Sequence, residues 1–504
     1  MKGIAKVVNG GAVPLSALTP LATDDFLTLL VDRIGAGQRV VAYFGVPAPN
    51  GLQLVAVIGD AQDGTLSVAT TIVTMTGIDS LAVVCPQLQL FEREIAEQYG
   101  LVFDAHPWFK PVRFHESYGD RDAWGRPRGV HPRVGVMEYY RVEGEEIHEV
   151  AVGPVHAGII EPGHFRFQCH GEVVFHLEIS LGYQHRGVEP RLAGVPTHRS
   201  AAVAETIAGD TTIGHTVAWA MVLESLSRRR ISPRAEVIRG VALELERLAN
   251  HTGDLGAIAG DVGYLPTASF CGRIRGDFLN MTALICGSRF GRGLVRPGGV
   301  LFDLEPERAA TLRERLSAAF DDLSNAVDLL WSTPSVMARL EGTGTVTSRM
   351  AVELGLVGPA ARACGVKRDV RHDFPAGIFR MTHLPVATAF HGDVCSRAMI
   401  RWQEIQKSVE FIADQLNALP RGEIHAEPGG LQPESIAVSL VEGWRGEICH
   451  VAITDAAGGI ARYKVVDPSF HNWMGLAMAL RGEQISDFPL CNKSFNLSYC
   501  GYDL

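Results

Sequence analysis

Short apolar runs alternate with polar turns over the first hundred residues, and this pattern predicts a small α+β domain. Strand-like runs rich in Val, Ile, Leu and Thr lie at residues 40–44, 52–58 and 66–73. Residues 91–101 instead space their apolar side chains at helical intervals, and Gly100 is suited to end that helix in a left-handed conformation. We assign this N-terminal domain to residues 1–115.

A stretch dense in Gly, Pro, Arg and Asp interrupts the apolar pattern between about residues 114 and 134. Such composition is typical of irregular chain, because Gly and Pro disfavour both helices and strands. We therefore expect a linker or extended arm at residues 116–145.

The remaining chain, residues 146–504, opens with β structure and then becomes helical. Strands are predicted at residues 139–142, 163–167 and 171–175. Helices with one apolar face are predicted at residues 236–250, 305–331 and 396–419. The overall expectation is an α+β fold: a small N-terminal α+β domain followed by a helical bundle with flanking β structure. No internal repeat at a fixed period is visible.

Composition supports a large globular protein, since 46% of the 504 residues are hydrophobic and 20% are charged. The sequence contains no run of about 20 unbroken apolar residues, so it predicts no membrane span. It also shows no recognisable secretory signal, and we therefore expect a cytoplasmic location. The net charge of -10 disfavours nonspecific nucleic-acid binding. We interpret the locally basic Arg228, Arg229 and Arg230 as a solvated helix end.

The nine cysteines are scattered, and none is spaced as Cys-x-x-Cys. This spacing indicates neither a local zinc site nor a disulfide framework. Flavin and nicotinamide sites also lack support, because no Gly-x-Gly-x-x-Gly follows a predicted strand.

Three motifs resemble those of nickel–iron hydrogenase large subunits. They are Arg186-Gly187-Val188-Glu189, the run Glu205 to Thr211, and Asp467-Pro468-Ser469-Phe470-His471-Asn472. In that family the second and third motifs carry four metal-binding cysteines, and here those positions hold Ala208, Thr211, Ser469 and Asn472. A nickel–iron centre needs soft thiolate donors, which these side chains do not supply. The resemblance therefore implies a large subunit that has lost all four metal ligands.

The predicted N-terminal helix has a resemblance of its own. Phe91-Glu92-Arg93-Glu94, then Gly100 and His106-Pro107, resemble the hallmark of the 30 kDa subunit of respiratory complex I. Further motifs stand in family order: Gly153-Pro154-Val155-His156, Gly182 to Glu189, Arg296-Pro297-Gly298-Gly299, Gly392-Asp393 with Arg397 and Arg401, and Trp444-Arg445-Gly446-Glu447. The whole chain is thus similar to fused 30 kDa and 49 kDa complex I subunits and to the large subunit of group 4 energy-converting hydrogenases, such as formate hydrogenlyase subunit 5.

The resemblance implies five candidate site residues. They are Asp254, Glu189, His156, Arg186 and Arg445. Asp254 matches the aspartate that complex I pairs with a quinone-binding histidine, and His156 or His164 would be that histidine, although either one could serve the fold alone. Glu189 is a candidate proton carrier or an ion-pair partner of Arg186. Arg445 matches an arginine beside the hydrogenase iron, so without the metal it is expected to gain a carboxylate, water or another ligand. The quinone-binding tyrosine of complex I is replaced by Gly209 or a neighbour.

Two further groups of residues have open interpretations. Asp393, Arg397 and Arg401 share one helix face, either as a solvated surface or, as the family match favours, as a buried charge network. A replacement zinc or iron site near the former ligand positions would draw on the side chains of His185, His215, His471 and Asp210, whose spacings match no metal motif.

The resemblance implies an oxidoreductase subunit of a complex I-like, energy-converting assembly. This chain would bind no cofactor of its own. Electrons would come from a 4Fe-4S cluster in a small iron–sulfur partner and would reduce a quinone or another acceptor, with ion translocation by antiporter-like and membrane-anchor-like partner subunits. The chain would then lie on the inner face of the cell membrane through those partners. The alternatives are a non-catalytic scaffold and, least favoured, an active hydrogenase.

Overall fold

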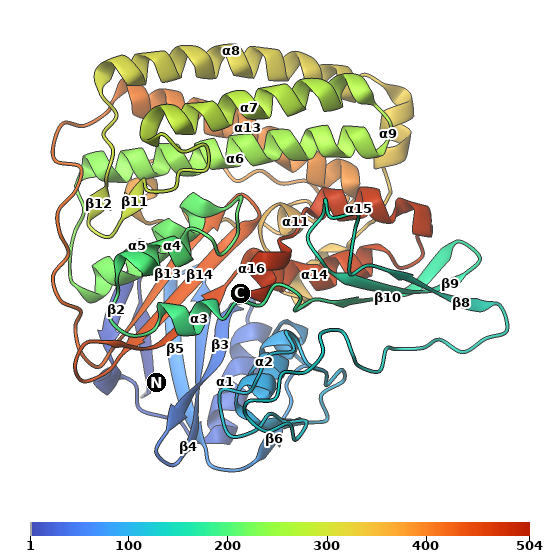
Figure 1. The fold of residues 1–504 in the computed structure, drawn as a ribbon, viewed down its shortest axis with the longest axis vertical. Coiled ribbons are helices and arrows are strands. Elements are labelled where there is room, and N and C mark those ends of the chain that lie inside the picture. Colours follow the sequence, from blue (N-terminus) through green and yellow to red (C-terminus); the bar gives the residue numbers. More distant parts are fainter. Residues whose placement is uncertain (1–2) are drawn as a thin grey trace.

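The computed structural model describes residues 3–504, beginning with a four-stranded sheet (Figure 1). The three predicted N-terminal strands are confirmed. The order of this antiparallel sheet is β1 (Ile4–Val7), β5 (Thr65–Val73), β4 (Gly51–Asp60) and β3 (Arg39–Ala48). Helices α1 (Thr23–Gly35) and α2 (Gln89–Tyr99) pack against it, and β6 (Gly77–Asp79) pairs in parallel with β7 (Val102–Asp104).

Helix α2 confirms the predicted helix, including its end. Gly100 adopts the left-handed conformation, with a φ of 76°, and its N–H bonds the carbonyl of Ala96. All side chains from Phe91 to Gln98 are buried, including three glutamates and one arginine. The charges of this helix therefore face partners inside the protein.

Residues 105–146 contain no helix or strand, and the structure corrects one strand prediction there. Residues 139–142 are irregular, and the Tyr140 N–H donates to Glu178 rather than to a neighbouring strand. The first strand here is β8 (Ile147–Val152), which pairs with β9 (His164–His170), followed by β10 (Val173–Ser180). The last two confirm the predicted strands with shifted bounds.

The predicted helical bundle is confirmed, and its long helices run side by side (Figure 1). Those helices are α6 (Pro233–Asp261), α7 (Leu265–Cys286), α8 (Pro306–Trp331) and α13 (Val394–Asn417). Helix α6 extends beyond its predicted end at residue 250, because it accommodates Gly253, Gly256 and Gly260. It ends at Asp261, shortly before Gly263, which has a φ of 74°. The predicted apolar faces are buried, with Phe320, Val409 and Leu419 at their edges.

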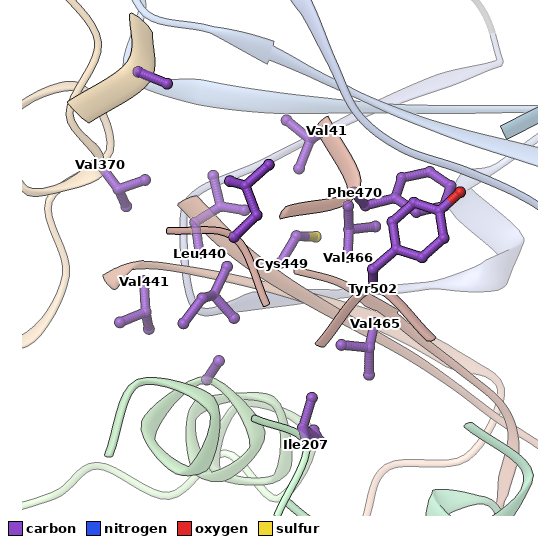
Figure 2. Packing of buried hydrophobic residues seen from close by; sticks show 14 of the residues in the cluster. Val41, Ile207, Val370, Leu440, Val441, Cys449, Val465, Val466, Phe470 and Tyr502 are labelled. Carbon is purple, nitrogen blue, oxygen red and sulfur yellow. The ribbon is translucent and has the colours of Figure 1, made fainter. Parts of the chain in front are cut away.

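A second sheet joins the two ends of the chain. Its order is β15 (Ile460–Val466), β14 (Gly446–Thr454), β13 (Ser435–Gly443) and β2 (Gly11–Pro14). The N-terminal strand β2 is antiparallel to β13, with Pro14 opposite Ser435. Helix α5 (Thr212–Leu226) covers this sheet, and Figure 2 shows Val41 of β3 near Leu440 and Val466 in one continuous core.

Shorter elements complete the fold. The α-helices are α3 (Val188–Leu192), α4 (His198–Ala204), α9 (Pro334–Leu340), α10 (Ser348–Glu353), α11 (Gly358–Arg362), α12 (Val370–Asp373), α14 (Pro468–Ala479), α15 (Phe488–Phe495) and α16 (Tyr499–Asp503). The 3₁₀ turns are η1 (Leu15–Ala17), η2 (Pro86–Leu88), η3 (Gly377–Arg380) and η4 (Ile485–Asp487), and a two-stranded ladder joins β11 (Val295–Arg296) to β12 (Gly299–Val300). Over residues 3–504, none of the helices combines the length and apolarity needed to cross a membrane.

Candidate functional site

The hydrogenase-like motifs converge around Arg445, in the turn between β13 and β14. Its guanidinium donates two hydrogen bonds to Asp210, with Nη1–Oδ1 and Nη2–Oδ2 distances of 2.6 and 2.8 Å. Nη1 also lies 3.2 Å from the Thr211 hydroxyl, and Nε donates to the carbonyl of Asn496. The guanidinium stacks on Trp444, 3.9 Å from the ring centroid. Arg445 has thus gained a carboxylate partner, one of the outcomes expected from the sequence.

The electrostatics of this pair follow from burial and attraction. Burial alone would raise the pKa of Asp210, but the charge and hydrogen bonds of Arg445 hold that pKa below its usual range. The Asp210 side chain keeps 34% of its surface exposed, whereas Arg445 keeps 4%. The pair therefore links a buried arginine to a carboxylate that solvent can reach.

The four positions that the resemblance assigns to metal ligands do not supply the donors of a nickel–iron centre. Ala208 offers no donor atom, and the Thr211 hydroxyl bonds Trp444 and Arg445. The Ser469 hydroxyl accepts the Ser498 N–H at 2.8 Å, and the Asn472 amide bonds both backbone groups of Val357. Nickel and iron of this kind require thiolates, and these hydroxyl and amide groups already serve the fold.

The replacement metal site also finds no support in the geometry. His215 lies between Asp467 and His450, at 3.0 and 3.1 Å, while His185 bonds the carbonyl of Asp503. Asp210 is held by Arg445 instead. Within residues 3–504, no three His, Cys, Asp or Glu side chains form a group suited to a metal ion.

Arg186 holds the loop that carries Ala208 and Thr211. It donates to the carbonyls of Thr206, Ile207 and Cys500 at 2.6, 2.9 and 3.0 Å. Its acceptors are therefore backbone groups, and its interaction is with this loop rather than with Glu189.

Glu189 instead faces β15, which connects it to the N-terminal domain. Its carboxylate bonds Arg462 at 2.7 Å and Lys464 at 3.0 Å, and Lys464 also bonds Glu94 of α2. Burial alone would raise the pKa of Glu189, but Arg462 and Lys464 hold it well below its usual range. Of the two roles considered for Glu189, the geometry favours an ion pair, although its partners differ from the expected Arg186.

Asp254 is connected to Arg445 through one asparagine. Its Oδ2 accepts a hydrogen bond from Arg401 Nε at 2.6 Å, and its Oδ1 accepts one from Asn496 at 2.5 Å. The carbonyl of Asn496 in turn accepts the Arg445 Nε–H. Arg397 and Arg401 are buried, as the family match favoured, and Asp393 caps α13 through the Ser396 N–H.

The two candidate histidines bond within the β8–β9 connection. His156 Nε2 lies 2.9 Å from the carbonyl of Gly163, and His164 Nδ1 lies 3.3 Å from that of Gly153. The loop tip exposes Val155 and Ile159, at 78% and 87%. The contacts of both histidines are those of fold-supporting groups. Asp254, the expected partner of one of them, bonds Arg401 and Asn496 instead.

Sequence reasoning missed two polar residues at the site, Asn496 and Glu246. Glu246 accepts the N–H groups of Ile213 and Gly214, at 2.7 and 3.1 Å, at the start of α5. Burial raises its pKa to about 8, against the lowering effect of those bonds. Glu246 lies on the side of α6 opposite the predicted apolar face of Val237, Val241 and Leu248, so no sequence pattern marked it as buried. Asn496 stands outside every motif.

Comparisons with known proteins decide the family. Residues 20–124 match the family described as respiratory-chain NADH dehydrogenase, 30 Kd subunit, and residues 261–433 match the 49 Kd subunit. A carbon monoxide-induced hydrogenase of Rhodospirillum rubrum is 30% identical over 348 residues, covering 69% of this chain and 96% of that relative. The chain belongs to the family of complex I subunits in which these two types are fused.

Other relatives of this fused subunit come from both branches of the family. Formate hydrogenlyase subunit 5 of Escherichia coli is 27% identical over 419 residues, covering 81% of this chain and 74% of that relative. NADH-quinone oxidoreductase subunit 4 of Thermus thermophilus is 28% identical over 369 residues, covering 68% and 90%. The fused subunit is therefore part of a multi-subunit oxidoreductase complex related to complex I and to hydrogenases.

Proposed function

We propose that this subunit reduces a quinone or a similar small acceptor and has no hydrogen chemistry. Electrons come from an iron–sulfur cluster in a small partner subunit, and the reaction drives ion translocation by membrane partners. The supporting observation is the Asp210–Arg445 pair, which stands against Thr211 at a former ligand position and reaches the surface. Its charged donors and the adjacent hydroxyl suit hydrogen bonding to the oxygen of a reduced acceptor.

The side chains proposed for this role are Asp210, Arg445 and Thr211, with Asp254 positioning them through Asn496. Arg186 orders the adjacent loop. His156 is proposed as a proton donor to the acceptor, because an imidazole nitrogen can carry a proton and the loop around it is exposed. Glu189 is proposed to hold the N-terminal domain against this region.

A specific observation favours one alternative, a non-catalytic scaffold. Arg186, Glu189, Asp254 and Arg445 all bond other parts of the same chain. Mutually satisfied charges are also what a purely structural subunit would need, since an unpaired buried charge is costly.

Quinone-dependent oxidation of the electron donor by the purified complex separates the two functions. Thr211→Val keeps the side-chain shape but removes the hydroxyl, and Asp254→Asn removes the charge that Arg401 faces. Catalysis predicts a loss of about ten- to hundredfold in kcat/KM for quinone in both variants. Glu353→Gln, an exposed substitution on α10, is the control and should keep full activity.

A scaffold predicts unchanged turnover in Thr211→Val and Asp254→Asn whenever the complex assembles. Assembly is checked by gel filtration and by thermal unfolding of each variant. Stoichiometric nickel together with hydrogen uptake would instead contradict the loss of hydrogen chemistry.

A further inference from the structure

A cavity lies away from the proposed redox site, at the junction of the N-terminal segment, α5, α6 and η3. Its volume is about 520 Å³. This lies within the range of roughly 300–1,000 Å³ found for sites that enclose small organic ligands. Gly240 of α6 lines it, and Asp254 stands fourteen residues further along the same helix, about 21 Å away. The cavity is therefore separate from the Arg445 region.

The inner wall of this cavity is largely apolar. Its apolar side chains come from the N-terminal segment, α5, α6, α12, η3 and β13, and include Val217, Met221, Leu243, Ile378, Phe379 and Leu440. Such a wall favours an apolar ligand body, because burying apolar surface releases about 25 cal/mol per Å².

Four of the eight charged groups in the lining are neutralised by ion pairs within the fold. Arg239 pairs with Glu224, Arg371 with Glu244, and Glu442 with Arg362. These groups do not select a ligand charge.

Three other arginines give the cavity an excess of positive charge. Arg229, Arg230 and Arg380 line it and are exposed to solvent. Arg380 donates to the backbone carbonyls of Pro375 and Asn9. Against them stands one half-buried carboxylate, Glu236, on the first turn of α6. A local cationic excess on a chain with a net charge of -10 favours an anion at this position.

We propose that this cavity binds an anionic amphiphile with a single acyl chain. The chain lies against the apolar wall, and the head group lies among Arg229, Arg230 and Arg380. The ligand is either a free long-chain carboxylate or an anionic lipid that places one chain in the cavity.

Calorimetric titration of the purified full-length protein with laurate, below its micelle concentration, tests this proposal. The expected result is saturable binding of one laurate. Arg229→Glu/Arg230→Glu should weaken it about five- to tenfold, because each partly screened ion pair contributes modestly. Ser225→Trp, which places a large ring in the cavity wall, should abolish it.

Arg228→Glu is the matched control, because Arg228 precedes these arginines and is exposed but lies outside the lining. It should bind laurate like the parent protein. Equal weakening by Arg228→Glu, equally tight binding of dodecyltrimethylammonium, or no laurate binding would overturn the proposal. Binding to vesicles containing phosphatidylglycerol that is abolished by Ser225→Trp would identify a lipid as the source. Vesicle binding that is insensitive to Ser225→Trp, without laurate binding, would reduce the feature to surface attraction and contradict the proposal.

Discussion

Each buried charged side chain of the candidate site has its own set of hydrogen-bonding and charged partners, and these partners stabilise the charge more strongly at some positions than at others. Arg445 has a carboxylate, a hydroxyl and a carbonyl within hydrogen-bonding distance. Glu246 receives two backbone N–H groups but lies beside a second acid, Asp210, which raises its pKa further. A buried carboxyl whose pKa differs between the folded and the unfolded state in this way makes stability depend on pH.

We predict that Glu246→Gln flattens the dependence of stability on pH. The pKa of Glu246 is raised from 4.5 to about 8 in the folded protein, so the folded state binds more protons than the unfolded state between these values. Its contribution is therefore present below about pH 4.5 and is lost as pH rises towards 8. The parent protein should lose about 1–4 kcal/mol relative to Glu246→Gln across this window, measured by urea unfolding.

Glu314→Gln provides the control for this prediction, because Glu314 is exposed on α8. Its profile should follow that of the parent protein. Parallel profiles for the parent and Glu246→Gln would show that Glu246 does not titrate in this window.

The candidate site could be predicted from the sequence only in part, for reasons visible at individual residues. Motif order located Arg445 and predicted a new partner, but Asp210 is 235 residues away and no spacing rule links them. Glu189 and Arg186 are three residues apart. Glu189 nevertheless lies in the first turn of α3 and faces β15, whereas Arg186 faces the loop before α5. Tertiary packing, rather than sequence distance, decides such pairings.

Among the elements, α2 shows how a helix end is fixed by close approach as well as by backbone conformation. A Cβ on Gly100 would stand 2.5 Å from the carbonyl oxygen of Arg121, in the segment that follows β7. The left-handed conformation therefore combines with a contact that leaves no room for a side chain.

We predict that Gly100→Ala destabilises the protein by about 2–4 kcal/mol, from left-handed strain plus displacement of the Arg121 backbone. The control is Gly37→Ala, because Gly37 has a similar φ of 85° but open space around its Cβ position. It should cost only about 1–2 kcal/mol. Denaturant midpoints measure both, and equal losses would contradict the role of the Arg121 contact.

The predictions of helices succeeded where one face of the helix is buried. The prediction of a strand failed where polar contacts determine the path of the chain. The apolar faces of α6, α8 and α13 predicted these helices. Residues 139–142 have strand-like composition, but bonds from Tyr139 to Gly135 and from Tyr140 to Glu178 hold them in an irregular path. Strand β8 was not predicted because its sequence, Ile147–Val152, mixes polar and apolar residues on a largely exposed strand.

At the scale of the whole molecule, buried ion pairs join the N-terminal domain to the rest of the chain. Glu94 of α2 bonds Arg113 and Lys464, and Lys464 also bonds Glu189. The hallmark helix of the N-terminal domain is thereby tied to β15 and α3 of the hydrogenase-like part of the chain.

We predict that Glu94→Gln destabilises the protein by about 3–5 kcal/mol, because it leaves Lys464 and Arg113 with less buried negative charge. Glu353→Gln removes an exposed partner of Arg349 and should cost less than about 1 kcal/mol. Unfolding free energies measure both. Cleavage of residues 105–146 by protease should also accelerate in Glu94→Gln, and an unchanged rate would argue against a joining role.

The pairing of β2 with β13 has a consequence for how the protein is made. The ribosome makes the segment 11–14 about 420 residues before its neighbours at 435–443. At translation speeds of about 5–20 residues per second, the early segment waits roughly 20–80 s for its neighbour. Its edge hydrogen-bonding groups are open to unwanted pairing during this interval, so nascent-chain chaperones have a defined period in which to act on it.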